Sequence, residues 1–393
     1  MIDIATAQAF VEKHSSPIAQ STVIELGEAL GFVLSEDAVS TIDMPPFRQS
    51  AMDGYALNIG NSNYYRLVGE VKAGDNSNLL LKSGEAARIF TGAPVPDTAN
   101  TVVMQEKVNT NDSQISVEGE VKIDINIRPK GEQIKTGDVA LEKGTTIKGA
   151  HIGFLASLGV TTVKVYKKPS VAIVVTGNEL VAPGNPLAFG EIYESNGIML
   201  KSVLSEVGYK TVSTLSVEDD YESTKSILQK AIDNHDVVIV TGGVSVGDYD
   251  FVGKALNAIG VEEVFYKVKQ KPGKPLFFGK KDEKSIFGLP GNPAAALSCF
   301  YIYVYPLLKR SQGASITSLQ RISMPLKEAY TVKGTRAQFL KAKVSERGVM
   351  VLGGQSSAMV RTFGDANALV FIPENISQIY EGEKVTTILL PNT

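Results

Sequence analysis

The sequence of 393 residues contains no tryptophan, one cysteine and three histidines. Cys299 alone cannot form a disulfide within the chain, and there is no cysteine cluster to ligate zinc or an iron–sulfur centre. His14, His151 and His235 lie far apart in the sequence, without the spacing of a histidine metal site. Carboxylates, lysines, hydroxyls and backbone amides are therefore the groups from which we expect any chemistry.

Long apolar runs and an excess of one charge are also missing. No stretch approaches the ~20 apolar residues of a membrane helix, and the first residues form no basic-then-apolar leader. Lys and Arg number 39 against 42 Asp and Glu, a net charge of -3, which argues against nucleic-acid binding through a basic face. We expect a cytoplasmic protein without membrane or nucleic-acid partners, in which local groups must contact any bound phosphate.

The patterns along the chain predict four domains and a fold class of α/β plus β. Residues 1–42 and 140–168 form an N-terminal helical and linker domain, with two short helices expected within 3–35 and one over 150–159. Residues 43–139 form an inserted β-domain of short strands between turn signals. Strands and helices alternate over 169–318, among them helices expected over 221–234 and 293–308 and a strand at 236–240, which predicts a doubly wound, mostly parallel sheet. Residues 319–393 return to short strands and form a small C-terminal β-domain.

Three unusual turns follow strands of the predicted sheet, at residues 176–179, 242–250 and 288–293. Ligands of open α/β sheets bind outside the carboxyl ends of the strands, so we expect the three turns to converge. In the third turn, Asn292 suits a helix N-cap and Pro293 a first helical residue, which leaves free amides at a helix start for an anion.

The second turn carries the clearest signal of an anion site. Gly242, Gly243 and Gly247 remove Cβ atoms where a phosphate would approach the backbone. Asp248 and Asp250 follow, and carboxylates beside a phosphate commonly share Mg²⁺ with it. On its own, this segment is equally consistent with a tight strand-to-helix turn bearing solvated acids.

Four lysines crowd the segment after that turn, namely Lys267, Lys269, Lys271 and Lys274. Alternate lysines on a strand would point one way and face a polyanion, although an edge strand protected by lysine has the same pattern. The neighbouring turns favour anion contact. Neither a P-loop nor a Gly-x-Ser-x-Gly elbow is present. We therefore expect a positioning and electrostatic site, with acids holding Mg²⁺ and with lysines and helix amides holding anionic groups.

The β-domain contributes two further candidates. Asp53 lies in the segment 50–56, which has no amphipathic pattern and is typical of a site, or alternatively of an Asp-Gly turn between strands. Thr91 offers a hydroxyl at the start of a proline-stiffened loop. We expect Cys299 to be a buried small apolar residue and four aromatic residues to pack in the core and at interfaces: Phe300, Tyr301, Tyr303 and Tyr305.

Together these segments resemble the MoeA-type molybdopterin molybdenumtransferase family, which is similar to the E domain of gephyrin and of its plant counterpart. The resemblance runs nearly end to end. It rests on seven ordered motifs: Pro46-Phe47 with Ser50-Ala-Met-Asp-Gly-Tyr-Ala56, Thr91-Gly-Ala-Pro-Val-Pro96, Arg128-Pro-Lys-Gly-Glu132, Thr176-Gly-Asn-Glu-Leu180, Thr241-Gly-Gly-Val-Ser-Val-Gly-Asp-Tyr-Asp250, Lys271-Pro-Gly-Lys-Pro275 and Leu289-Pro-Gly-Asn-Pro293.

The resemblance implies an enzyme that inserts molybdate into adenylylated molybdopterin and releases AMP in a Mg²⁺-dependent reaction. It also implies an elongated homodimer in which a second protomer completes the cleft, a sheet like that of MogA-type molybdopterin-binding domains, a small C-terminal β-barrel, and other proteins of molybdenum cofactor biosynthesis as partners. By position it implies six catalytic residues, Asp53, Thr91, Glu179, Asp250, Lys267 and Lys271, of which Glu179 and Asp250 bind the metal. The implied substrate-binding residues are Asp219, Asp220, Gly242, Gly243, Ser245, Gly247, Asp248, Lys274, Pro290, Gly291, Asn292 and Pro293.

Three departures from the family pattern alter the expected pocket: Arg48-Gln49 in place of Asp-Asn, Gln133 in place of Asp, and Ala294-Ala295 in place of Val-Ser. Two other functions stay open, a molybdopterin adenylyltransferase and a non-catalytic scaffold like gephyrin. The extra β-domains and the retained acids favour the metal-inserting enzyme. Molybdate and tungstate are tetrahedral dianions of nearly equal size, so the sequence does not separate them.

Overall fold

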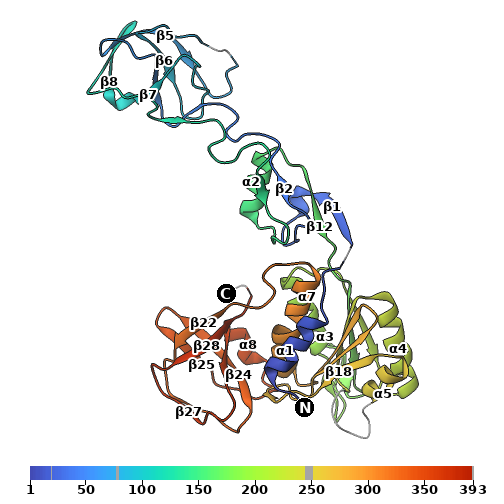
Figure 1. Cartoon of the computed structure of the whole chain (residues 1–393). Coiled ribbons are helices and arrows are strands. Elements are labelled where there is room, and N and C mark those ends of the chain that lie inside the picture. Colours follow the sequence, from blue (N-terminus) through green and yellow to red (C-terminus); the bar gives the residue numbers. More distant parts are fainter. Residues whose placement is uncertain (19, 77–78, 244–250, 392–393) are drawn as a thin grey trace.

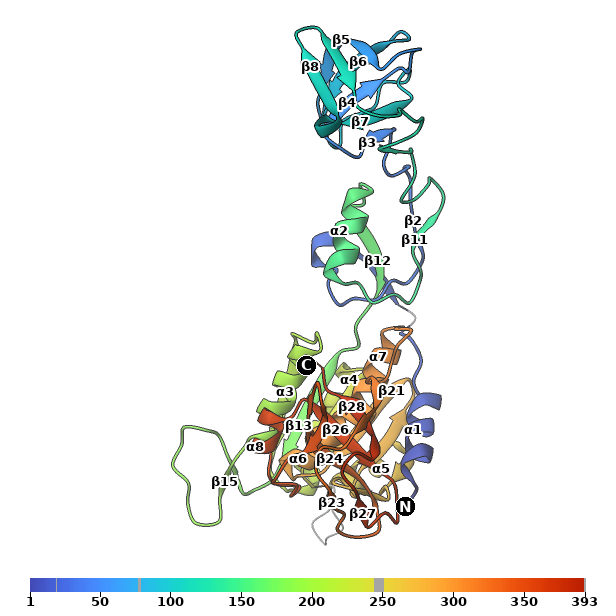
Figure 2. The same ribbon diagram turned by 90° about the vertical axis from the view of Figure 1, so that its left-hand side faces the viewer.

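The computed structural model is an elongated chain, described over residues 1–18, 20–76, 79–243 and 251–391 (Figure 1). A β-domain lies at one end and a small domain in the middle. An α/β sheet and a C-terminal β-domain lie together at the other end, as the turned view also shows (Figure 2). The domain that carries Asp53 is thus separated from the α/β sheet by the whole middle domain.

The α/β sheet has six strands, and its first four are parallel, as the alternation of elements predicts. Its order is β16 (Val212–Val217), β13 (Val171–Thr176), β17 (Val237–Thr241), β21 (Lys284–Leu289), β20 (Phe277–Lys281) and β18 (Glu262–Tyr266). The last two are antiparallel to their neighbours. Both β13 and β17 are buried along their whole length, which explains their unbroken apolar sequences.

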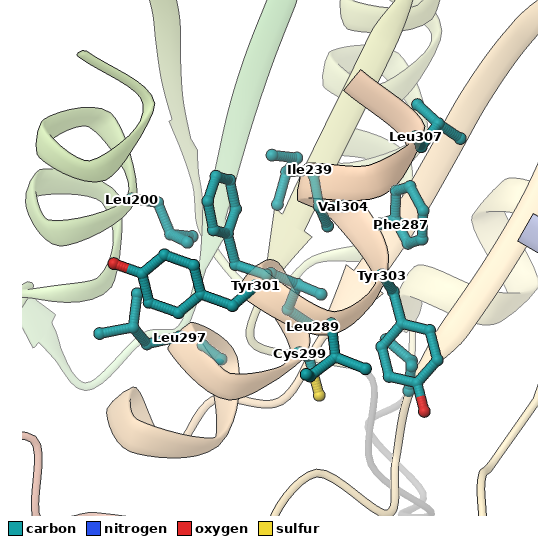
Figure 3. Close-up of a cluster of buried hydrophobic side chains, with 14 of the residues drawn as sticks. Leu200, Ile239, Phe287, Leu289, Leu297, Cys299, Tyr301, Tyr303, Val304 and Leu307 are labelled. Carbon is teal, nitrogen blue, oxygen red and sulfur yellow. The ribbon is translucent and has the colours of Figure 1, made fainter. Parts of the chain in front are cut away.

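Helices cover both faces of this sheet, because alternate residues of each strand point to opposite sides. Ile173 and Ile239 pack with the helices of one face, α1 (Ile4–Lys13), α3 (Asn196–Glu206), α6 (Pro293–Cys299) and α7 (Tyr305–Ser311). Val174 and Val240 pack with those of the other, α4 (Tyr221–Asn234) and α5 (Phe251–Ala258). Figure 3 shows part of the first cluster, where Val304 lies beside Ile239 and Leu307 beside Phe287.

The single helix expected over 293–308 is divided by a π-helical turn, η3 (Phe300–Val304), between α6 and α7. Such a turn inserts one residue into the helical repeat and rotates the side chains that follow it. All five of its residues are buried.

Two sequence expectations for the N-terminal segment differ from the structure. No second α-helix is present in the described residues of 3–35, where β1 (Ser21–Glu25) pairs instead with β12 (Thr162–Tyr166) and only the short 3-10 helix η1 (Leu26–Glu28) follows. The spacing of Val23 and Leu26 fits a helix locally, but pairing with a distant strand decides the structure. In addition, α1 packs on the α/β sheet rather than with the middle domain. The helix expected over 150–159 is present as α2 (Gly149–Ser157).

The inserted β-domain is built on one six-stranded sheet with its own two core clusters. The strand order is β7 (Thr101–Met104), β4 (Gly54–Leu57), β6 (Glu85–Ile89), β5 (Tyr64–Val71), β9 (Gln114–Val117) and β8 (Val108–Asn111). Short pairs, β3 (Gln49–Ser50) with β10 (Ile127–Arg128) and β2 (Ala38–Val39) with β11 (Val139–Leu141), lie along the connection to the middle domain. Met44 also bridges to Ile134, so the chain enters and leaves this domain side by side.

The strands of the C-terminal domain form a closed ring. Successive pairing links β22 (Arg321–Pro325), β28 (Lys384–Leu389), β26 (Ala368–Ile372), β24 (Ala337–Ser345) and β25 (Gly348–Val351). A bridge between Leu326 and Val349 then joins the end of β22 to β25. The short strand β19 (Gln270–Lys271), from the α/β part, adds to the edge of β24 and ties the two domains together.

No helix in the described ranges has both the length and the apolar character needed to span a bilayer.

Candidate active site

A cleft of about 480 Å³ opens at the carboxyl ends of β13 and β17. Thr176, Glu179 and Gly242 line it together with the turn from Pro290 to Pro293. The three turns singled out from the sequence therefore converge, as the topology of a parallel sheet requires. Asn196, at the start of α3, and the short strand β15 (Ile192–Tyr193) complete the wall of the cleft.

Asn196 connects two of these turns and was not predicted from the sequence. Its side-chain Nδ2 donates to the hydroxyl of Thr241 at 2.9 Å and to the carbonyl of Gly291 at 2.7 Å. Its Oδ1 is buried and makes no hydrogen bond to the described residues. Asn196 thus fixes the end of β17 to the third turn, and its only sequence signal is an asparagine at the start of a helix.

Glycine is required at the second turn for a steric reason. Gly242 has φ +92°, and a Cβ built on it would lie 2.1 Å from the carbonyl oxygen of Thr176. Gly243 has φ +60°, and its Cβ would lie 2.7 Å from Val252. The backbone of this turn therefore lies directly against β13. The predicted residues Ser245, Gly247, Asp248 and Asp250 lie outside the described part of the chain.

The two acids at the end of β16 have different surroundings. Asp219 is half-buried and accepts a hydrogen bond from the hydroxyl of Thr176, which lines the cleft. Asp220 is exposed and caps α4, because its carboxylate accepts from the backbone amide of Ser223 at 2.8 Å. That amide is the main reason that the pKa of Asp220 lies below its usual value. Asp219 is thus coupled to the cleft wall, whereas Asp220 stabilises a helix start.

The lysine segment is less regular than the strand expected from the sequence. Lys267 has φ +68°, and only Gln270–Lys271 form a strand. Lys267, Lys269 and Lys271 still alternate with two buried residues, so the alternation of exposure expected for a strand is kept. In the described structure these lysines do not line the cleft, whereas the nearby Pro275 does. The bend at Lys267 follows from its pairing, since its backbone N–H donates to Leu276 and its carbonyl accepts from Ile2.

Asp53 and Thr91 form a pair at the far end of the molecule. One carboxylate oxygen of Asp53 accepts from the backbone amide of Thr91 at 2.7 Å and from its hydroxyl at 2.8 Å. These two bonds lower the pKa of Asp53, with a smaller contribution from the charge of Arg88. Within one chain the pair does not reach the cleft, because the middle domain separates them (Figures 1 and 2).

Comparisons with known proteins agree with this architecture. Three family models match in order: the MoeA N-terminal region (domain I and II) at residues 2–159, a probable molybdopterin binding domain at 172–310, and the MoeA C-terminal region (domain IV) at 323–390. A molybdopterin molybdenumtransferase from Staphylococcus aureus is 34% identical over 97% of this chain and 94% of its own. The chain belongs to the MoeA family. The family expected from the seven motifs is thus confirmed.

Other MoeA relatives cover nearly the same extent. A molybdopterin molybdenumtransferase from Staphylococcus epidermidis is 34% identical over 93% of this chain and 90% of its own. Among solved structures, the molybdopterin biosynthesis MoeA protein of Pyrococcus horikoshii OT3 superposes with a TM-score of 0.86 at 28% identity, covering 99% of this chain and 100% of the other. The elongated multidomain fold is therefore that of the MoeA family.

In this MoeA chain the C-terminal domain also contributes to the cleft. Ala358 lines it, and its neighbour Ser357 accepts a hydrogen bond from the side chain of Asn292 at 3.0 Å. The carbonyl of Ser357 accepts from the backbone N–H of Ala295 at 3.2 Å. The amide of Ala295, which the sequence predicts to be free for an anion, is therefore occupied, and the side chain of Asn292 makes no capping hydrogen bond to the helix. The segment 353–360 carried no sequence signal for the cleft, because the cleft residue that it bonds, Asn292, lies 65 residues earlier in the chain.

The same segment is held by Lys341, whose side chain is 3% exposed. Its ammonium donates to the carbonyls of Gly354 at 2.7 Å, Ser356 at 3.3 Å and Met359 at 2.8 Å. Burial lowers the pKa of Lys341, because desolvation disfavours the cation. Lys341 therefore fastens a wall of the cleft to β24.

The described residues offer few metal ligands. No three His, Cys, Asp or Glu side chains converge within these ranges, and Glu179 is the one predicted ligand whose position is known. Mg²⁺ commonly keeps several waters and binds one or two carboxylates together with substrate phosphates. Glu179 is exposed on the cleft wall, so the donor chemistry fits a magnesium ion held jointly with a phosphate.

Proposed function

We propose that this chain inserts molybdate into adenylylated molybdopterin, releasing AMP and yielding molybdenum cofactor. Membership of the MoeA family over nearly the full length carries the proposal, because the curated relatives have the transferase name. The converging turns supply a cleft with glycine backbone at Gly242, where an anionic guest can approach the main chain. Neither the adenylyltransferase nor the scaffold is favoured by an observation of this structure.

Charge is the main physical problem of the proposed reaction. Molybdate is a dianion, and it must approach a substrate that already bears phosphates, so like-charge repulsion has to be offset. In the proposal, Glu179 and Asp250 hold Mg²⁺ together with the phosphates, and Lys267, Lys271 and Lys274 contact anionic groups. Cleavage of the phosphoanhydride leaves charge on AMP, which preorganised donors stabilise.

The proposal includes a homodimer and a cytoplasmic location. Asp53 and Thr91 are remote from the cleft of their own chain, so a second copy is the way to bring such a pair to it (Figures 1 and 2). Cys299 is a buried free thiol, which suits a reducing compartment. An enzyme that adenylylates molybdopterin is the partner class that must supply the substrate.

Turnover of adenylylated molybdopterin with molybdate and Mg²⁺ tests the activity directly. We expect release of AMP and formation of molybdenum cofactor, and no product from molybdopterin and ATP. Product only from molybdopterin and ATP would identify an adenylyltransferase. No product from either mixture would leave the non-catalytic scaffold as the remaining function. Replacing molybdate by tungstate in the same assay measures the oxyanion preference.

Complementation tests the shared cleft. Asp53→Asn and Glu179→Gln should each be inactive, whereas heterodimers of the two should contain one intact site. Random pairing gives roughly a quarter of the wild-type activity. No recovery in isolated heterodimers would show that the two residues do not act across a dimer.

Calorimetric titration with Mg²⁺ in the presence of AMP tests the metal site. Glu179→Gln should weaken Mg²⁺ binding, because it removes a carboxylate ligand, as should Asp250→Ala. Glu206→Gln is a matched control, since Glu206 is exposed at the opposite end of α3. Equal affinity in all four proteins would contradict the assignment of Glu179 and Asp250.

A further inference from the structure

A buried polar cluster lies beneath the turn that carries Lys271 and Lys274. Gln270, Tyr303 and Cys299 are each 1% exposed, within a surrounding that is otherwise apolar. The Tyr303 hydroxyl donates to Oε1 of Gln270 at 2.5 Å, and Nε2 of Gln270 donates to the carbonyl of Gly273 at 2.9 Å. The amide of Gln270 therefore has a partner at both ends and a fixed orientation.

These bonds hold the turn that carries Lys271 and Lys274, the lysine turn, against the core. The Nε2 group of Gln270 reaches forward to Gly273, so the side chain spans the turn that contains Lys271. Gly273 has φ +83°, and a Cβ built on it would lie 2.4 Å from Sγ of Cys299. The guanidinium of Arg336 donates to the backbone carbonyl of Gln270 at 2.8 Å. The turn is thus held from below by the cluster and from the side by β24.

The π-helical turn η3 accounts for the position of Tyr303. Figure 3 shows the ring of Tyr303 and the sulfur of Cys299 pointing to the same side of this helical segment, while the ring of Tyr301 points to another. The extra residue of a π turn changes the angle between successive side chains. Tyr303 therefore does more than fill the core, because its hydroxyl reaches Gln270.

We propose that Gln270 and Tyr303 are positioning residues that hold Lys271 and Lys274 in place for an anionic substrate. The identity of that substrate, adenylylated molybdopterin with molybdate, rests on the proposed function above. Water cannot replace the Tyr303 hydroxyl at a site that is 1% exposed, so its loss leaves Oε1 of Gln270 without a donor and the amide held at its Nε2 end alone. The lysine turn then loses its fixed geometry while the core around it is retained.

Tyr303→Phe tests the proposal with the removal of one oxygen atom, and Tyr301→Phe is the matched control from the same turn. We expect Tyr303→Phe to raise the KM for molybdate roughly tenfold with little change in kcat, the loss expected for one buried hydrogen bond. A merely structural role would instead lower the active fraction, and hence kcat, at constant KM. Gln270→Met, which keeps the length of the side chain, should have the same effect on KM.

Combination with Lys271→Met and Lys274→Met shows whether the cluster acts through the lysines. In a chain that lacks both amines, Tyr303→Phe should change the KM by less than about twofold, because residues that act as one unit are not additive. An unchanged KM in Tyr303→Phe, or an equal effect with and without the lysines, would overturn the proposal.

Calorimetric titration with pyrophosphate separates this inference from the proposed function. Weaker binding to Tyr303→Phe than to Tyr301→Phe supports the positioning role, even if the wild-type chain does not turn over adenylylated molybdopterin. Normal wild-type turnover with identical pyrophosphate binding by both variants refutes the positioning role and leaves the transferase assignment intact.

Discussion

Lys341→Met should destabilise the protein by removing an ammonium that three backbone carbonyls accept. Methionine preserves the length and most apolar contacts of the side chain but cannot donate to Gly354, Ser356 or Met359. Gly354 keeps a second donor, the hydroxyl of Thr362 at 3.3 Å. The substitution therefore removes the ammonium from all three carbonyls, of which Gly354 retains this hydroxyl and Ser356 retains the backbone N–H of Met359 at 3.1 Å.

The size of the effect follows from these contacts. Each charge-assisted hydrogen bond contributes about 1.5–3 kcal/mol, and removing a buried cation returns part of its desolvation cost. We expect a net loss of about 2–3 kcal/mol. If the α/β sheet and the C-terminal domain unfold together as one cooperative unit, this loss lowers the Tm of that unit by roughly 5–10 °C. Differential scanning calorimetry and urea unfolding measure it.

Lys343→Met is the matched control, since Lys343 lies two residues further along β24 and is exposed. A surface substitution of this kind changes the stability by less than about 0.5 kcal/mol. Equal losses in the two variants, or no loss in Lys341→Met, would refute the reasoning that the ammonium holds segment 353–360. The segment lines the cleft through Ala358, so we also expect the KM of the proposed reaction to rise in Lys341→Met alone.

Substitutions at three further positions test local features. Thr91→Val removes the hydroxyl that helps to lower the pKa of Asp53, so this pKa should rise toward 3.8 in an NMR titration. The stabilisation from the wild-type pair is present above pH 3.8, and it is lost as the pH falls through the lowered pKa that Asp53 has in the folded protein. Asp220→Ala should lower the urea concentration at the midpoint of unfolding through loss of the α4 cap, whereas Asp220→Ser should retain most of the stability. Gly242→Ala should cost roughly 2–4 kcal/mol in the same measurement, because its Cβ would overlap the Thr176 carbonyl.

Much of the α/β fold was predictable because its signals are local. The helix expected over 221–234 coincides with α4, and the strand expected at 236–240 differs from β17 by one residue at each end. The segment Ser21–Glu25 was not predictable in the same way, since its partner strand lies about 140 residues later in the chain. Local spacing cannot represent such a pairing, which overrides helical propensity.

The site was predictable where topology alone brings residues together. Glu179, Gly242 and Asn292 follow strands or begin a helix at one edge, so their convergence follows from the parallel sheet. Asn196 and Lys341 were missed because their importance depends on contacts with other segments. In the sequence, a buried lysine on a strand cannot be distinguished from a solvated one, because the carbonyls that accept from it belong to another segment.

The bridge between Met44 and Ile134 lies where the chain enters and leaves the inserted β-domain. Their backbones are already hydrogen-bonded, with Met44 N–H donating to the carbonyl of Ile134 at 2.9 Å. A direct connection from Met44 to Ile134 therefore requires no rerouting of the backbone on either side. Deletion of residues 45–133 should remove the β-domain, with Asp53 and Thr91, and leave the remaining domains folded.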